Sequence, residues 1–184
     1  MDKSSKSLMH VPYFECKDLL VAASLNGGNV LAAFVQLLHS WQTELNDNQS
    51  SQPSIDNLWS RLIELGLRSN SIAKEDFSAA LFGERHDPSM CAYIHNIRSV
   101  NISQINNVGT IFRGICHWIV TNLFDMLGEN VKTITGIIGA GSALMKNAVL
   151  QKELHDQVHG HLTFNEDCDA AYGAALFISM KTVV

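Results

Sequence analysis

The amino-acid sequence predicts an α/β fold with a substantial hydrophobic core. Hydrophobic residues make up 46% of its 184 residues and charged residues 17%, which is the balance of a folded globular chain. Helical periodicity dominates the first two thirds, whereas the last third alternates β-branched strands with helices. Two strands joined through a helix in this way should run parallel, with helices packed against the sheet.

The first third of the chain is predicted to contain a flexible arm, one strand and two helices. The arm is the polar segment 1–12, and the apolar run 19–25 is predicted to be a buried strand that ends in a tight turn. Apolar residues recur at three- and four-residue spacing over 29–41, which predicts a helix. A second helix should begin after Ser54, whose hydroxyl can cap it, and end near Gly66.

The middle of the chain combines an irregular region with the longest predicted helix. Residues 70–100 lack a regular pattern and are predicted to form a long loop region. A broad apolar stripe then predicts a helix over 103–127, and Gly128 follows where a C-terminal capping glycine belongs. Gly109 and Thr110 lie inside this helix, so we interpret them as packing positions and not as a phosphate loop.

The last third has the clearest pattern. Residues 131–138 are β-branched and predict a strand, and Gly139–Ser142 turns into a helix that should run to about Val158. A second strand is predicted over 161–164, followed by a small-residue helix that opens at Asp169.

Composition excludes several functions. The net charge is −5, with 13 basic residues scattered among 18 acidic ones, so no nucleic-acid partner is expected. No apolar run is long enough to predict a membrane span, and no secretory signal begins the chain. The chain is therefore expected to be cytoplasmic. Its cysteines show no paired spacing, which predicts neither a disulfide framework nor a zinc site: Cys16, Cys91, Cys116 and Cys168.

The Gly139–Ser142 turn is the strongest local indication of a ligand. A strand that ends in glycines and feeds a helix exposes unpaired amides, where a nucleotide can approach the backbone. A tight turn without any ligand explains the same residues equally well. A dinucleotide ligand is an alternative, because the acidic pair Glu166 and Asp167 follows the next strand, where a dinucleotide-binding fold has its ribose-binding carboxylate. Against it, Leu144 stands where the glycine fingerprint of such folds has its third glycine.

Five motifs occur in an order that resembles the C-terminal region of the FGGY carbohydrate kinases, across about residues 12–180. They are AASLNGGNVL at 22–31, LFGER at 81–85, FRGI at 112–115, GAGS at 139–142 and AYGAA at 171–175. Each is weak alone, and the set in this order is fairly specific. One departure is Ala140, which replaces the middle glycine of the family's usual triple and still permits close approach.

This resemblance implies an incomplete actin-like (ribonuclease H-like) ATPase lobe over 13–184. It implies ATP and Mg²⁺ as cofactors and a ketose as the acceptor, with sedoheptulose as the leading candidate. The residues it places against ATP are Gly139, Ala140, Gly141, Ser142, Gly27 and Gly28. It gives the loop around Glu84 the role of supporting the cleft. The family's catalytic and sugar-binding residues belong to an N-terminal lobe that this sequence lacks, so no catalytic or metal-binding residue is assigned.

The missing lobe leads to two expectations. The chain alone should have no sugar kinase activity, because phosphoryl transfer needs several parts positioned together. Its lobe interface should expose an apolar surface, through which we hypothesise self-association. A non-catalytic kinase-like fragment that acts as a binding module and a small NAD-binding protein remain the alternatives.

Overall fold

The computed structural model of the chain describes residues 8–13, 17–46, 54–70, 77–95, 108–158 and 160–166. The helices are α1 (Gly28–Leu45), α2 (Ile55–Arg68), α4 (Val108–Leu127), α5 (Ser142–Met145) and α6 (Ala148–Gln157), with a 3₁₀ helix, η5 (Gly128–Thr133). The strands are β1 (Leu8–Pro12), β2 (Asp18–Ala22), β3 (Phe77–Ser78), β4 (Tyr93–Ile94), β5 (Gly136–Ala140) and β6 (His161–Asn165). The predicted α/β class is confirmed, and the helix predicted from Asp169 lies outside the described residues.

The described strands pair two by two. β1 pairs with β2 and β3 with β4, both antiparallel, while β5 and β6 run parallel and place Gly136 opposite His161. The parallel pairing predicted for the last third is therefore confirmed for this pair.

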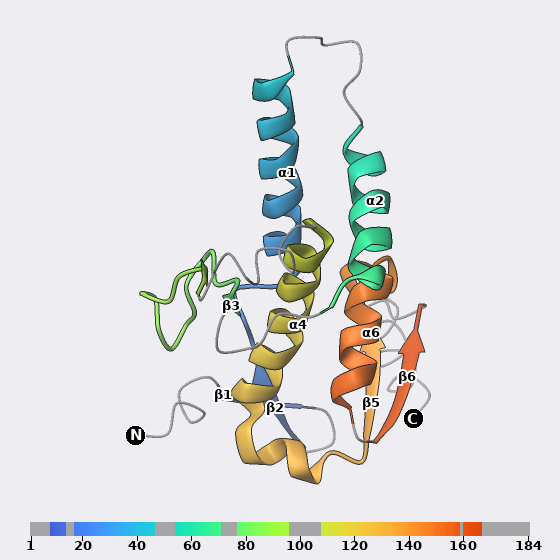
Figure 1. The fold of residues 1–184 in the computed structure, drawn as a ribbon. Coiled ribbons are helices and arrows are strands. Elements are labelled where there is room, and N and C mark those ends of the chain that lie inside the picture. Colours follow the sequence, from blue (N-terminus) through green and yellow to red (C-terminus); the bar gives the residue numbers. More distant parts are fainter. Residues whose placement is uncertain are drawn as a thin grey trace, which may run out of the picture.

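Helix α4 lies in the middle of the molecule, with α2 and α6 packed against it (Figure 1). Its stripe supplies much of the core, and Phe112, Ile115 and Ile119 are all buried. A Cβ added to Gly109 would lie 2.5 Å from the Leu65 carbonyl carbon of α2, which confirms that Gly109 is a packing position. Within the described part of the chain, no helix is long and apolar enough to span a membrane.

The predicted boundaries of α2 and α4 are confirmed where the structure describes them. Ser54 caps α2, because its Oγ accepts a hydrogen bond from the Asn57 amide at 3.2 Å. Gly128 follows α4 with a φ of 56°, the left-handed conformation that glycine adopts most easily. The start predicted for this helix, before Val108, lies outside the described residues.

Two predictions at the N-terminal end are wrong. The flexible arm predicted for 1–12 is a strand over its described part, because Leu8–Pro12 forms β1 against β2. β2 was predicted to be buried, yet it is exposed or half-exposed along its length. A two-stranded antiparallel ribbon supplies its backbone hydrogen bonds without needing a buried face.

The strand predicted over 131–138 begins later than its β-branched residues suggest. Residues 128–133 form η5, in which the Thr133 hydroxyl donates to the Asn130 carbonyl at 2.8 Å. Lys132 also forms an ion pair with Glu129. These local contacts outweigh β-propensity, so the strand starts at Gly136.

The single helix predicted from Ser142 to Val158 is divided in two. α5 ends at Met145, and α6 begins at Ala148. Asn147 separates them as an N-cap, since its Oδ1 accepts from the amides of Val149 and Leu150 at 3.0 and 3.2 Å. Asparagine competes with the helix backbone in this way and favours such a position.

Candidate functional site: a pocket between two glycine turns

The two glycine turns predicted to bind ATP are brought together in the fold. A Cβ added to Gly28, the first residue of α1, would lie 2.8 Å from the Ala143 Cβ in α5. No real Cβ pair comes this close, so the two helices approach to a distance that only glycine permits here. These turns are more than a hundred positions apart, and neither local pattern indicates their contact.

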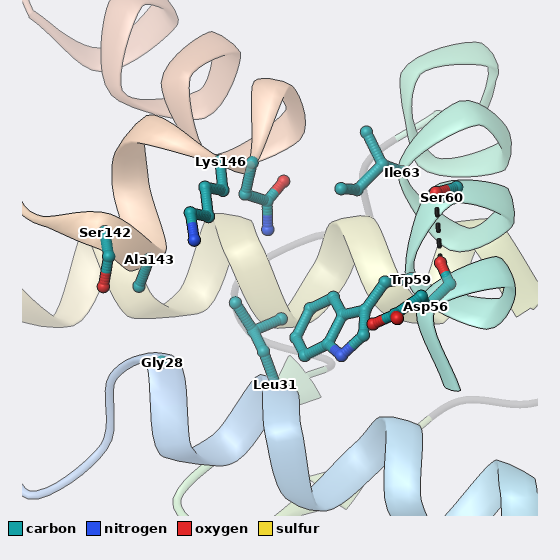
Figure 2. A pocket seen from close by; sticks show the side chains of 10 residues that line it. Gly28, Leu31, Asp56, Trp59, Ser60, Ile63, Ser142, Ala143 and Lys146 are labelled. Atoms are coloured by element: carbon teal, nitrogen blue, oxygen red, sulfur yellow. Dashed lines mark hydrogen bonds between the residues drawn. The ribbon is translucent and has the colours of Figure 1, made fainter. Parts of the chain in front are cut away.

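A pocket of about 480 Å³ opens beside this contact. Its residues come from α1, α2 and the α5–α6 segment: Gly28, Leu31, Asp56, Trp59, Ser60, Ile63, Ser142, Ala143, Lys146 and Asn147. Figure 2 shows Trp59 of α2 and Lys146 beyond α5 reaching toward the space between the helices, with Leu31 below. The lining combines an apolar, aromatic side with separate polar and charged groups, as small-molecule sites commonly do.

The aromatic side of the pocket is held by the core. The Trp59 ring packs edge-on against Phe112, with ring centroids 6.1 Å apart and planes at 81°. Phe112 is fully buried in α4, so it offers Trp59 a fixed surface.

The turn before α5 contains two glycines with different structural reasons. Gly141 has a φ of 97° and faces open space, so its requirement is conformational. Gly139 is buried, and a Cβ there would meet the Phe164 ring at 2.8 Å and the Leu144 side chain at 2.9 Å. Gly139 is therefore needed for the packing of β5 against β6 and α5.

The turn before α1 is held by a buried carboxylate. Glu84 is 0% exposed, and its Oε1 accepts from the Ser24 hydroxyl at 2.5 Å and from the Asn26 amide nitrogen at 3.0 Å. Its Oε2 accepts from the Leu25 backbone amide at 3.1 Å. Asn26 also donates to the Gly83 carbonyl at 2.5 Å and accepts from the Phe82 amide at 3.1 Å. The segment 24–26 that leads into the glycine turn is thus bonded at several points to the loop 82–84.

Glu84 remains ionised in this setting. Burial alone would raise the pKa of Glu84, but hydrogen bonds from Ser24, Asn26, the Leu25 amide and Asn122 outweigh it and hold the pKa below its ordinary value. A buried acceptor with this many donors fixes the geometry of its surroundings. The cleft-supporting role that the sequence resemblance implied for the loop stays a prediction.

The chain is 36% identical to the sedoheptulokinase of Mus musculus over 173 residues, which cover 92% of this chain and 34% of the mouse protein. It is also 36% identical to the Homo sapiens sedoheptulokinase over 170 residues, covering 91% of this chain and 34% of the human protein. The chain is similar in sequence to both of these sedoheptulokinases.

The resemblance to carbohydrate kinases that the five motifs predicted is therefore confirmed. The chain spans about a third of the length of the curated relatives that it matches. No family model matches the chain, and no solved structure matches it either.

The six residues predicted to bind ATP do not all line the same space. Gly28 and Ser142 line the pocket described above, and Gly27, directly before Gly28, is the N-cap of α1. Gly139, Ala140, Gly141 and Ser142 line a second, mainly apolar cavity of about 950 Å³ between β2, α4 and β5. Ser142 and Ala143 line both cavities, so the first residues of α5 separate the two.

The sequence did not reveal the contribution of α2. Asp56, Trp59, Ser60 and Ile63 follow the three- and four-residue spacing of one helix face, next to the core stripe of Leu58 and Leu62. In the sequence, the one indication of this pocket wall was that Trp59 shares a helix face with the polar residues Asp56 and Ser60. Asn147 was missed because it was assigned to a helix interior.

The second cavity has apolar walls that are partly open to solvent. Ile138 of β5 is 70% exposed, and Leu19 of β2 and Leu123 of α4 are also exposed. The self-association expected from the sequence stays a prediction.

Proposed function

We propose that the pocket between α1, α2 and α5 binds the adenosine part of ATP, and that this chain is the nucleotide-binding lobe of a carbohydrate kinase. The proposed acceptor in the complete enzyme is a ketose, with sedoheptulose as the leading candidate because both curated relatives are sedoheptulokinases. An actin-like arrangement of the lobe is part of the same proposal.

The observation that carries the proposal is the close approach of the two glycine turns at the mouth of the pocket. Gly28 begins α1 and lies directly against Ala143 of α5, and both residues line the pocket. A side chain at Gly28 would collide with Ala143, so glycine is needed there for the two helices to meet. The N-terminal end of a long helix beside the pocket favours a ligand that carries phosphate.

The lining of the pocket suits a flat, polar-edged base. The Trp59 ring and the side chains of Leu31 and Ile63 give apolar surface for the faces of a purine, while Asp56 and Lys146 supply polar groups for its edges. A volume of about 480 Å³ lies within the usual range for small-molecule sites. The turn at Ser142 and Ala143 borders both cavities, so a nucleotide in the pocket would extend its phosphates along that turn.

The proposal assigns no Mg²⁺ ligand. Among the residues that the structure describes, no three His, Cys, Asp or Glu side chains lie together in a way that could hold a metal ion. Mg²⁺ is proposed to arrive with ATP, where it would neutralise charge on the phosphates.

The decisive experiment is calorimetric titration of the purified chain with Mg-ATP, and separately with NAD. Binding of Mg-ATP alone is expected, and binding of NAD alone would replace the proposal with the dinucleotide alternative. Ser60→Trp fills the pocket from its rim and should abolish binding, because Ser60 is an exposed residue that lines it.

A matched control places the same bulk elsewhere on the helix. Arg61→Trp is one position further around α2, outside the pocket lining, and loses only an exposed ion pair with Glu64. It should bind like the unaltered chain. Sugar-dependent ADP release is a separate measurement: turnover by the chain alone would contradict the expectation of inactivity, and nucleotide binding without turnover fits either a kinase lobe or a non-catalytic module.

A further inference from the structure

Arg113 of α4 bonds both elements that face each other across the proposed nucleotide pocket. Its Nη1 donates to the Ser69 carbonyl at the C-cap of α2 over 2.5 Å, and its Nε donates to Glu153 Oε1 on α6 over 2.6 Å. Arg113 itself does not line the pocket. The Arg113 side chain thus connects the end of α2, which forms one wall of the pocket, to α6, which follows the Lys146–Asn147 segment of the other wall.

These contacts are shielded from water, which makes them strong. The Arg113 side chain is 13% exposed and that of Glu153 is 3% exposed. The second carboxylate oxygen of Glu153 lies 2.8 Å from His117 Nδ1, and Asp156 lies 3.8 Å from Arg113 Nη2. A charge-assisted bond of the planar guanidinium group fixes direction as well as distance.

Burial tends to raise the pKa of Glu153, but the hydrogen bonds and charges of His117 and Arg113 outweigh it and hold the pKa below its ordinary value. Glu153 is therefore ionised at neutral pH and is a charged partner for Arg113. The hydrogen bond from Arg113 to Ser69 also places a positive charge at the C-terminal end of α2, which the helix dipole favours.

The two helices that Arg113 connects, α2 and α6, are in contact at Gly66 of α2. A Cβ on Gly66 would lie 2.9 Å from the Val149 side chain of α6 and 3.2 Å from the Phe112 ring of α4. Beyond this contact, α2 presents Trp59 and α6 is preceded by Asn147, and both line the pocket. A helix is a stiff element, so a shift of the end held by Arg113 would change the spacing at the other end.

We propose that Arg113 is a positioning residue that sets the separation of α2 from the α5–α6 segment, and thereby the affinity of the pocket for its nucleotide. Its bonds to Ser69 and Glu153 pin the two walls on one side of the Gly66 contact. This inference rests on the proposed nucleotide function. It requires no contact between Arg113 and the ligand.

The test compares Mg-ATP affinity and unfolding free energy in the full chain. Arg113→Lys keeps the charge but cannot hold both partners with one planar fork, and it should raise Kd about ten-fold. The double variant Arg113→Met with Glu153→Met replaces the buried pair by apolar groups of similar length, so it should keep much of the stability while still weakening binding.

The matched control is Met126→Ala, which creates a cavity at a buried position of the same helix, outside the lining of both cavities. It should lower stability without changing Kd at a temperature where every variant is folded. Unchanged affinity in both Arg113 variants, or an equal loss in Met126→Ala, would overturn the inference while leaving the proposed function intact. Absence of Mg-ATP binding by the unaltered chain would overturn both.

Discussion

Asn122 of α4 donates a hydrogen bond to Glu84 over 2.7 Å, although the two residues are 38 positions apart in the sequence. The same carboxylate oxygen accepts from Ser24, so α4, the loop 82–84 and the segment before α1 converge on one atom. The start of α1, which borders the proposed nucleotide pocket, is therefore fixed to the central helix through Glu84.

Replacing Glu84 with glutamine should lower the unfolding free energy by about 3 kcal/mol. The NH₂ group of glutamine cannot accept the hydrogen bonds that a carboxylate oxygen of Glu84 accepts, so buried donors lose their acceptor. Nucleotide affinity should fall as well, since the turn before α1 loses its anchor. Urea unfolding and calorimetric titration measure the two effects. Glu129→Gln is the control, because Glu129 is exposed and pairs with Lys132 nearby in sequence; equal losses in the two variants would contradict the role given to Glu84.

Stability should also fall in acid through Glu84 and Glu153. Both have a folded-state pKa below the ordinary glutamate value of about 4.3, so their stabilisation is fully present above that pH. It is lost as pH falls through the lowered folded-state pKa values, where the carboxylates become protonated. Unfolding free energy measured between pH 7 and pH 3 should decline less steeply in Glu84→Gln than in the unaltered chain, and parallel curves would refute the assignment.

The two glycines before α5 should respond differently to a second substitution. Gly139→Ala introduces a Cβ against Phe164, so a second change, Phe164→Ala, should recover part of the lost stability. Gly141→Ala meets no neighbour but holds a left-handed φ, and its loss of about 1 kcal/mol should not be recovered by Phe164→Ala. A double-mutant cycle for each pair tests this difference.

Gly109→Ala should be strongly destabilising, by about 3 kcal/mol, since the added methyl would meet the backbone of α2 at Leu65. Backbone atoms cannot rotate away as a side chain can. Gly136→Ala is the matched control, because its nearest contact is at the ordinary distance of 3.6 Å. Thermal unfolding of both variants should separate them clearly; similar melting temperatures would mean that α2 and α4 are not packed as the structure has them.

Cys116 should resist thiol reagents in the folded chain. Burial raises the pKa of Cys116 to about 12, so almost no thiolate is present at pH 8. In a variant with Cys16, Cys91 and Cys168 replaced by serine, iodoacetamide labelling should be slow until denaturant is added. Fast labelling without denaturant would show that α4 opens readily from the core.

The sequence determined the elements whose causes lie within a few neighbouring residues. The hydroxyl of Ser54 and the left-handed Gly128 act at the end of a single helix, and the apolar stripe of α4 repeats with the period of that helix. All three patterns are therefore visible in the order of residues. Where two local preferences competed, the pattern misled, as with η5 against a strand and with Asn147 inside an apparent helix.

Only the tertiary structure decided which distant residues meet. Gly28 lies against Ala143, Glu84 collects donors from two segments, and Arg113 bonds both α2 and α6. Such contacts depend on how helices pack around a shared core, and that packing depends on the shapes of many side chains at once. Glycine in a turn can be read from the sequence, but the partner that makes it necessary becomes known only when the chain is folded.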